Sequence, residues 1–199
     1  MEFYLKMMNY RCRSCFKLLE IDEKHKILKP GNVVVDVGAA PGSWSQVCVK
    51  AVNSDGADVS KPKGVVIGID RLQIYPMDGA TFMGNSDFTS TATHEKIKNI
   101  LNGRKANCVL SDMAPNATGV RSMDQDNIMD LAFSVFNFAL QVSAPDAILL
   151  IKVWDNGDVH KLEKLLSIAY ESYKHVKPLA SRSDSAEKFI LAKGFKKSN

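Results

Sequence analysis

The sequence lacks the features that mark membrane-embedded, metal-bound or disulfide-rich proteins. No apolar run approaches the ~20 residues of a membrane-spanning helix. Only Cys12 and Cys15 have C-x-x-C spacing among four cysteines, no second pair completes a zinc or redox motif, and the four histidines are scattered singly. We therefore expect no metal ion, and four free thiols in a reducing compartment.

Targeting signals and extremes of composition are missing as well. The N-terminus shows neither a signal-peptide core nor an Arg- and Ser-rich transit segment, so the protein is either not targeted or has lost a presequence. A net charge of +4 permits a nucleic-acid partner without demanding one. With 199 residues, 45% of them hydrophobic, and no internal repeat, we expect one globular domain over residues 1–199, acting as a monomer.

The most informative stretch follows an apolar run at residues 32–37 and reads Asp36-Val37-Gly38-Ala39-Ala40-Pro41-Gly42-Ser43-Trp44. An acidic residue closing a buried strand, a tight Gly/Ala/Pro turn and an amphipathic helix are typical of a doubly wound sheet that holds a nucleoside cofactor. The Gly-x-Gly-x-x-Gly pattern of dinucleotide folds is absent, and Pro41 sits where a phosphate would need a free N–H group. A cofactor without phosphates, such as S-adenosylmethionine, fits this loop better than NAD.

The hydrophobic pattern alternates between amphipathic stretches and short β-branched runs. It predicts helices over residues 13–28, 44–52, 93–101, 124–142 and 159–173, and strands over residues 33–37, 65–69, 80–83, 108–111 and 148–153. The tail predicts a hairpin of two strands, 173–179 and 188–192, and residues 53–63 read as a surface insertion. This order implies an α/β fold with a mostly parallel sheet and one antiparallel strand near the C-terminus.

Charged side chains follow the ends of several predicted strands. Ligands of open α/β sheets bind beyond the carboxyl ends of the parallel strands. The sequence places there Asp36, Asp70, Asp87, Asp112 and Lys152. If the final strand is antiparallel, its amino end brings Glu187 to the same edge. An Asp at a strand end can also be a turn former or helix cap, and Glu187 alone reads as a solvated surface residue. Lys152 interrupts an apolar run, where an ammonium is costly unless paired or deprotonated; a lysine that snorkels at the strand end is the alternative.

Four separate motifs resemble one known family. They are Arg13-Ser14-Cys15-Phe16-Lys17-Leu18-Leu19-Glu20, the Gly/Ala stretch followed by Ser45-Gln46, Ser111-Asp112-Met113-Ala114-Pro115-Asn116, and Ser181-Arg182 leading to Glu187. Their order and spacing resemble the FtsJ/RrmJ ribosomal RNA 2′-O-methyltransferases. Tyr10-Arg11-Cys12-Arg13-Ser14 and Asn116-Ala117-Thr118-Gly119 resemble the mitochondrial branch. Ser43 stands where the family pattern often has Gly, a small change in this loop.

The resemblance implies a Rossmann-like class I S-adenosylmethionine-dependent methyltransferase, with a seven-stranded sheet and helices on both faces. It implies a catalytic set of Lys17, Asp112, Lys152 and Glu187. It implies cofactor contacts from Pro41, Gly42, Ser43, Trp44, Asp70, Asp87, Phe88 and Asp112. The implied substrate is a ribose 2′-hydroxyl of large-subunit rRNA or of a pre-ribosomal particle, with uridine preferred. The implied location is the mitochondrion, with the cytoplasm and the nucleolus as alternatives.

Lys152 is the candidate base for this reaction. A ribose hydroxyl is a poor nucleophile at neutral pH, so a base must take its proton as the new bond forms. Asp112 and Glu187 would orient Lys152 and the hydroxyl. In the alternative, Lys152 stays protonated, water accepts the proton, and catalysis is mostly positioning. We expect RNA to lie over a basic rim formed by Arg11, Arg13, Lys17, Arg121, Lys174, Lys177 and Arg182.

Two other functions are compatible with parts of this pattern. A small-molecule methyltransferase could share the fold, but it would have no reason to keep the Lys/Asp/Lys/Glu set. A non-catalytic ribosome-assembly factor could use the fold only to bind rRNA, and the candidates at all four catalytic positions argue against it. Methyl transfer to rRNA that depends on those four positions distinguishes the three functions.

Overall fold

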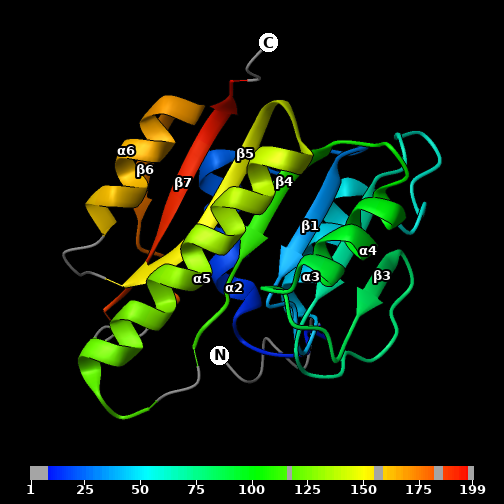
Figure 1. Cartoon of the computed structure of the whole chain (residues 1–199). Helices are drawn as coiled ribbons and strands as arrows, with labels where there is room; N and C mark the ends of the chain where they lie inside the picture. Colours follow the sequence, from blue (N-terminus) through cyan, green and yellow to red (C-terminus); the bar gives the residue numbers. More distant parts are fainter. Residues whose placement is uncertain (1–8, 116–117, 155–158, 182–185, 197–199) are drawn as a thin grey trace.

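A seven-stranded sheet forms the centre of the protein in a computed structural model, which describes residues 9–115, 118–154, 159–181 and 186–196 (Figure 1). The strand order is β3-β2-β1-β4-β5-β7-β6, and every neighbouring pair is parallel except those of β7, which runs antiparallel to β5 and β6. The predicted fold class is therefore confirmed. The elements in chain order are α2 (Cys15–His25), β1 (Val33–Val37), α3 (Ser43–Val52), β2 (Val65–Ile69), β3 (Ala80–Met83), α4 (Thr91–Leu101), β4 (Ala106–Ser111), α5 (Arg121–Val142), β5 (Ser143–Trp154), α6 (Val159–Ala169), β6 (Tyr170–Val176) and β7 (Glu187–Phe195).

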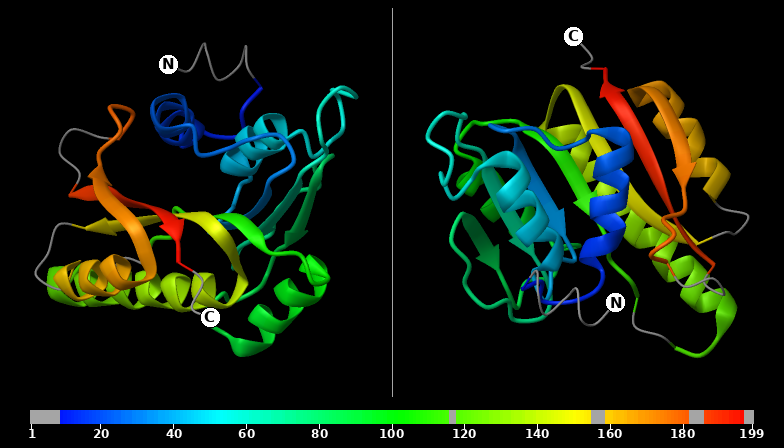
Figure 2. Two further views of the ribbon diagram at one scale, coloured as in Figure 1. Left: turned by 90° about the horizontal axis from the view of Figure 1, so that it is seen from above. Right: turned by 180° about the vertical axis from the view of Figure 1, so that it is seen from behind.

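Helices cover both faces of the sheet, and each face has its own apolar core. Helices α4, α5 and α6 lie on the face seen in Figure 1, while α2 and α3 lie on the opposite face, seen from behind in Figure 2. Because side chains alternate along a strand, β1 serves both cores. Val35 and Val37 pack under α4–α6, and Val34 packs under α2 and α3. Burial on both faces holds β1, and with it the loop that follows, in a fixed position.

Helix α6 is shorter than predicted, because it ends at Ala169 and the chain continues directly into β6. Tyr170 belongs to the strand and pairs with Phe195 of β7. Its ring is fully buried and lies 5.3 Å from the Phe195 ring, centroid to centroid. Burial of this aromatic side chain on the sheet outweighs continuation of the helix.

Strand β5 is longer than predicted, because it begins at Ser143 and includes Pro145. The register between β4 and β5 is irregular between Ala106 and Cys108. Residues 144–147 fall in this irregularity, which is where a strand tolerates a proline without an N–H group. The sequence pattern, which placed Pro145 before the strand, gave no sign of the irregular register.

Helix α2 is shorter than predicted at both ends. It begins at Cys15, and after His25 the residue Lys26 adopts a left-handed conformation with φ of 51°. The Asp22 carboxylate accepts the next two backbone N–H groups, which completes the helix end. No helix in the described ranges is both long and apolar enough to cross a membrane.

Candidate functional site

The loop after β1 turns the chain sharply from the sheet into α3. Gly38 and Gly42 have φ of +79° and +106°, values that residues with a side chain rarely adopt. A Cβ on Gly38 would lie 2.7 Å from Cγ of Met113, and a Cβ on Gly42 would lie 2.7 Å from a guanidinium nitrogen of Arg11. Glycine is therefore required for the close packing of this loop against the β4 loop and against the N-terminal segment.

A cleft of about 320 Å³ opens among the loops that follow β1, β2, β3 and β4. It lies at the carboxyl edge of the parallel strands, where open α/β sheets bind ligands, and its size suits a small molecule. The lining combines loop backbone, apolar side chains and carboxylates. It includes Gly38, Ala40, Asp70, Arg71, Asp87, Phe88, Asp112, Met113 and Leu131.

Two carboxylates of this cleft are fixed by different partners. Asp70 Oδ2 accepts the N–H of Ala40 at 2.9 Å, so Asp70 fastens the loop after β1 to the end of β2. Asp87 forms an ion pair with Arg71 at 2.7 Å and accepts hydrogen bonds from the Thr89 N–H and hydroxyl. The Arg71 guanidinium and the Thr89 donors lower the pKa of Asp87 to about 2. Asp87 is therefore ionised at neutral pH, and the one arginine in the lining is already paired.

Asp36 does not reach the cleft, so its expected place at the ligand edge is wrong. Its side chain follows the parity of Val34 and points toward α3, where it is fully buried. Its Oδ2 accepts a hydrogen bond from Ser45 Oγ at 2.6 Å. Burial raises the pKa of Asp36 to about 7. Asp36 thus anchors α3 beneath the loop instead of facing a ligand.

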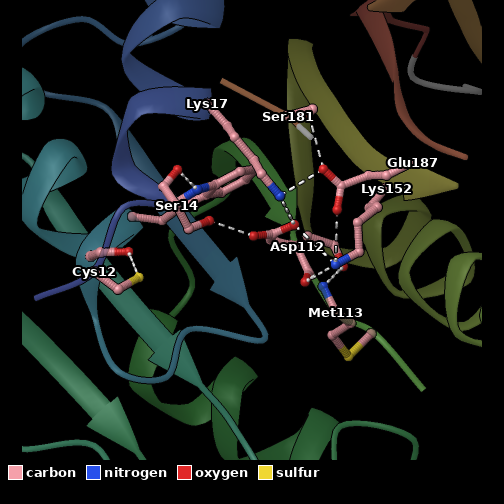
Figure 3. Close-up of polar contacts among 11 residues, drawn as sticks. Cys12, Ser14, Lys17, Asp112, Met113, Lys152, Ser181 and Glu187 are labelled. Carbon is pink, nitrogen blue, oxygen red and sulfur yellow. Dashed lines mark hydrogen bonds and ion pairs between the residues drawn. The ribbon is translucent and has the colours of Figure 1, made fainter. Parts of the chain in front are cut away.

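Four charged side chains from separate elements converge next to the cleft (Figure 3). Lys17 comes from α2, Asp112 follows β4, Lys152 belongs to β5, and Glu187 is the first residue of β7. Glu187 pairs with Trp154 in the antiparallel register, so the amino end of β7 lies at the carboxyl edge of β5. Sheet topology therefore brings Glu187, from late in the chain, to the end of β5 beside Lys152.

The four side chains form a closed ring of alternating charge, here called the charged ring. Lys152 Nζ lies 3.0 Å from Asp112 Oδ1 and 3.8 Å from Glu187 Oε2, and it donates a hydrogen bond to the Asp112 carbonyl at 2.7 Å. Lys17 Nζ lies 2.6 Å from Glu187 Oε1 and 3.9 Å from Asp112 Oδ1. Each ammonium thus faces both carboxylates. The Lys152 side chain is only 7% exposed, and this pairing compensates for the lost solvation of its charge.

Two serines hold the carboxylates of the charged ring. Ser14 Oγ donates to Asp112 Oδ2 at 2.6 Å, and Ser181 Oγ donates to Glu187 Oε1 at 3.1 Å (Figure 3). The Ser14 carbonyl also accepts the indole N–H of Trp44 at 2.9 Å. Ser14 therefore connects α3 with the charged ring. The sequence did not predict this role, although Ser14 lies three residues before Lys17 in the motif at residues 13–20.

The predicted cofactor residues fall into two groups. Four of them line the cleft: Asp70, Asp87, Phe88 and Asp112. The other four do not belong to its lining: Pro41, Gly42, Ser43 and Trp44. Trp44 is buried, and its ring lies 5.7 Å from that of Phe189 on β7. From this loop it is Gly38 and Ala40 that face the cleft. The sequence pattern singled out this Gly/Ala turn, but it did not show which residues of the turn face the cleft.

The arginines expected on an RNA-facing rim differ in their surroundings. The Arg11 guanidinium donates to the carbonyls of Pro41, Tyr75 and Pro76 at 2.8–2.9 Å. It therefore links the loop after β1 to the segment between β2 and β3. Arg13 is exposed, and its guanidinium has no recorded partner in the part of the chain that the structure describes. Arg121 is the first residue of α5, and Arg182 lies outside the described residues.

A mixed sheet with a cleft at the carboxyl edge of its parallel strands, beside a ring of lysines and carboxylates, is typical of α/β enzymes that bind a small molecule. The chain belongs to the FtsJ-like methyltransferase family, whose profile matches residues 10–195. The resemblance carried by the sequence motifs is thereby confirmed, and the protein is a methyltransferase.

Individual relatives are similar over nearly the whole chain. A Drosophila melanogaster protein named "rRNA methyltransferase 2, mitochondrial" is 56% identical over 191 residues, which is 96% of this chain and 76% of the relative. "Ribosomal RNA large subunit methyltransferase E" of Parvibaculum lavamentivorans is 45% identical over 193 residues, 96% of this chain and 75% of the relative. A solved structure of a Plasmodium falciparum protein assigned to the ribosomal RNA methyltransferases has a TM-score of 0.80 at 26% identity, covering 94% of this chain and 98% of that one.

Proposed function

We propose that the protein transfers a methyl group from S-adenosylmethionine to a ribose 2′-hydroxyl of large-subunit ribosomal RNA in mitochondria, with uridine as the modified nucleotide. The observation that carries the proposal is the charged ring directly beside the cleft, with Asp112 belonging to both. Membership of the family supplies methyl transfer. The relatives' names support rRNA, the large subunit and the mitochondrion, and the motif resemblance supports the 2′-hydroxyl and uridine.

The chemistry of the cleft fits S-adenosylmethionine, which carries adenine, a ribose with two hydroxyls, a sulfonium cation and no phosphate. Asp70 and Asp87 offer acceptor oxygens for hydroxyl groups, and Phe88 and Met113 offer apolar surface for a base. Carboxylates dominate the charge of the lining, which favours a cationic ligand over a phosphate. When bound, the cofactor supplies an electrophilic methyl carbon.

The charged ring prepares the acceptor. The 2′-oxygen must reach the methyl carbon in line, with the reacting atoms about 3–3.5 Å apart. Lys152 lies where ring and cleft meet, because its Nζ is bound to both the carbonyl and the carboxylate of Asp112. Lys152 takes the proton of the 2′-hydroxyl as that oxygen bonds to the methyl carbon, and Asp112 and Glu187 orient Lys152 and the hydroxyl.

The exposed Arg13 contributes to RNA binding in this proposal. It lies in the turn before α2, four residues ahead of Lys17, and its guanidinium is available to phosphate. Arg11 has a different role, because its guanidinium donates to three backbone carbonyls in the loops after β1 and β2. We therefore expect an Arg11→Ala change to act through cofactor binding and an Arg13→Ala change to act through RNA affinity.

Labelled methyl transfer tests the proposed function. Purified protein is incubated with methyl-labelled S-adenosylmethionine and large-subunit rRNA, as free RNA and as assembled subunit, and the RNA is digested to nucleosides. We expect label in a 2′-O-methylated nucleoside, and no transfer to free nucleosides or catechols. Label on a base, or no label with either substrate, contradicts the proposal. Mapping of ribose methylation across mitochondrial rRNA after loss of the protein identifies the nucleotide.

A further inference from the structure

A second hollow, of about 220 Å³, lies on the α2 face of the sheet, away from the cofactor cleft. In Figure 2 α2 lies over the sheet on the face opposite α5 and α6, with β7 and β6 at the edge beside it. The hollow lies between α2 and the second half of β6, and we refer to it as the α2–β6 groove. It is lined chiefly by Ile21, Lys24, His25, Lys174, Val176 and Lys177.

The charge of the α2–β6 groove is one-sided. Lys24 and Lys174 are exposed, and Lys174 Nζ lies 3.2 Å from His25 Nδ1. Lys193 of β7 lies beside them and donates to the His25 carbonyl at 2.7 Å. Within the described ranges, none of these three lysines has a carboxylate partner. Glu20, the acidic residue of the lining, is occupied by two backbone N–H groups of the segment after β6.

The clustered cations already act on one another. The pKa of His25 is lowered, first by burial and then by Lys174, Lys193 and Lys24. The pKa of Lys193 is lowered as well, first by burial and then by Lys174 and Lys29. In the charged ring, by contrast, each lysine faces two carboxylates. A bound anion would relieve the repulsion in the groove, whereas the ring needs none.

On its helical side, the groove continues from the charged ring. Lys17, Ile21 and Lys24 stand at i, i+4 and i+7 of α2 and therefore share one face of the helix. Seven residues at 1.5 Å each place Lys24 about 10 Å along the axis from Lys17. That distance equals the rise of roughly three nucleotides of a stacked strand, at ~3.4 Å each.

On the sheet side, the same continuity follows from strand register. Lys152 pairs with Phe189, and Phe189 pairs with Val176, so these residues form one cross-strand row at the ring. Lys174 lies two residues before Val176 and therefore points to the same face. The groove thus begins at Val176, in the same cross-strand row as Lys152 and two strands away from it.

We propose that the α2–β6 groove binds the sugar–phosphate backbone of the RNA substrate next to the modified nucleotide, with Lys24, Lys174 and Lys193 neutralising phosphates. The proposal rests on the proposed function, because continuity with the charged ring is what selects RNA over an acidic protein. Phosphate contacts position a nucleic acid without reading its sequence. The groove therefore sets which ribose along the strand reaches Lys152.

A triple variant, Lys24→Gln/Lys174→Gln/Lys193→Gln, tests the groove. The matched control, Lys63→Gln/Lys96→Gln/Lys164→Gln, removes the same charge from exposed lysines elsewhere. Affinity for a short single-stranded rRNA fragment is measured against salt concentration, and S-adenosylmethionine binding and thermal melting check the fold. We expect at least tenfold weaker RNA binding. The slope of log K against log salt should fall by about 2, at ~0.7 for each lost phosphate contact.

The outcomes separate the groove from the proposed function. An unchanged RNA affinity and salt slope in the folded triple variant, or equal losses in the control variant, would overturn the proposal that the groove binds RNA. If the triple variant does not fold, the Lys24→Gln/Lys174→Gln variant changes only exposed side chains and should lower the slope by about 1.4. If the protein binds RNA through the groove but transfers no methyl group, the proposed function is overturned and the groove proposal stands. If the protein does not bind RNA, both proposals are overturned. Tighter binding of a polyglutamate peptide than of RNA, lost in the same variant, assigns the groove to an acidic partner instead.

Discussion

The cleft and the charged ring lie side by side at one edge of the sheet, yet different interactions hold each of them in shape. Backbone geometry forms the cleft, through the positive φ of Gly38 and the Asp70 bond to the Ala40 N–H. The ring consists of side chains from four distant parts of the chain, joined by ion pairs. The cleft should therefore be sensitive to added volume, and the ring to removed charge.

Among the substitutions that compare the two regions, Asp112→Asn should have the largest effect, because it keeps the shape of the cleft and removes a charge from the ring. Asp112 positions Lys152, and a positioned proton-handling group is worth roughly 10²–10⁴-fold, so we expect turnover to fall by roughly 10²–10³-fold, with S-adenosylmethionine affinity within about threefold of wild type. Single-turnover kinetics and calorimetric titration measure the two quantities. The control Asp87→Asn should show the reverse, with weaker cofactor binding and near-normal turnover. A similar loss of turnover in both variants would contradict the assignment of cofactor binding to the cleft and of turnover to the ring.

A Gly38→Ala change should damage the cleft and spare the ring. Its Cβ would meet Met113 Cγ at 2.7 Å and Met113 backbone atoms at 3.0 Å, at a φ of +79°. We expect the free energy of unfolding to fall by about 1–3 kcal/mol and cofactor affinity to fall about tenfold. Gly103→Ala is the matched control, because its φ is +78° and nothing lies within 4 Å of the added Cβ. Equal loss of cofactor affinity in both variants would show that backbone strain alone is responsible.

An Asp36→Asn change distinguishes the buried carboxyl beneath the cleft from the ion-paired side chains of the ring. The folded-state pKa of Asp36, about 7, lies above the ordinary value of 3.8, so the native state holds the extra proton. The contribution of the protonated Asp36 carboxyl to the free energy of unfolding is complete below about pH 4 and is lost as pH rises toward 7. The melting temperature of the variant relative to wild type should therefore rise between pH 4 and pH 8. Asp130→Asn, at an exposed position, should show no such trend.

A Ser14→Ala change should have the smallest effect, although Ser14 touches both regions. Asp112 loses one hydrogen bond but keeps its contacts with both lysines. The Ser14 carbonyl that holds Trp44 is unchanged. We expect kcat to fall about three- to tenfold with KM for the cofactor unaltered, and Ser14→Thr to restore it. A change in cofactor KM that matches the change in kcat would contradict a role confined to Asp112.

Much of this arrangement could be predicted from the sequence because it follows from alternation and topology. The strand and helix order defined the parallel sheet, and a single antiparallel strand was enough to bring Glu187 toward Asp112 and Lys152. The structure shows that convergence directly, with all four pairwise contacts between lysines and carboxylates within 4 Å. The catalytic roles of these residues remain predictions.

What could not be predicted depends on orientation and on tertiary partners. Asp36 stands one residue before the end of β1, and that parity turns it toward α3 instead of the ligand edge. Arg11 carries no local sign that its guanidinium will bind carbonyls at Pro41, Tyr75 and Pro76. Tyr170 ends α6 because of a partner on β7 far along the chain. Such contacts exist only once the sheet has formed.

The rate of methyl transfer by a Lys152→Ala enzyme tests the central claim most directly. The variant must first be shown to bind S-adenosylmethionine and rRNA within about threefold of wild type, so that only the step at the ring is compared. Loss of a positioned proton-handling group costs roughly 10²–10⁴-fold, and a fall of that size in the single-turnover rate is the result expected if the charged ring performs the reaction. A rate close to that of wild type, with both ligands bound, would contradict it.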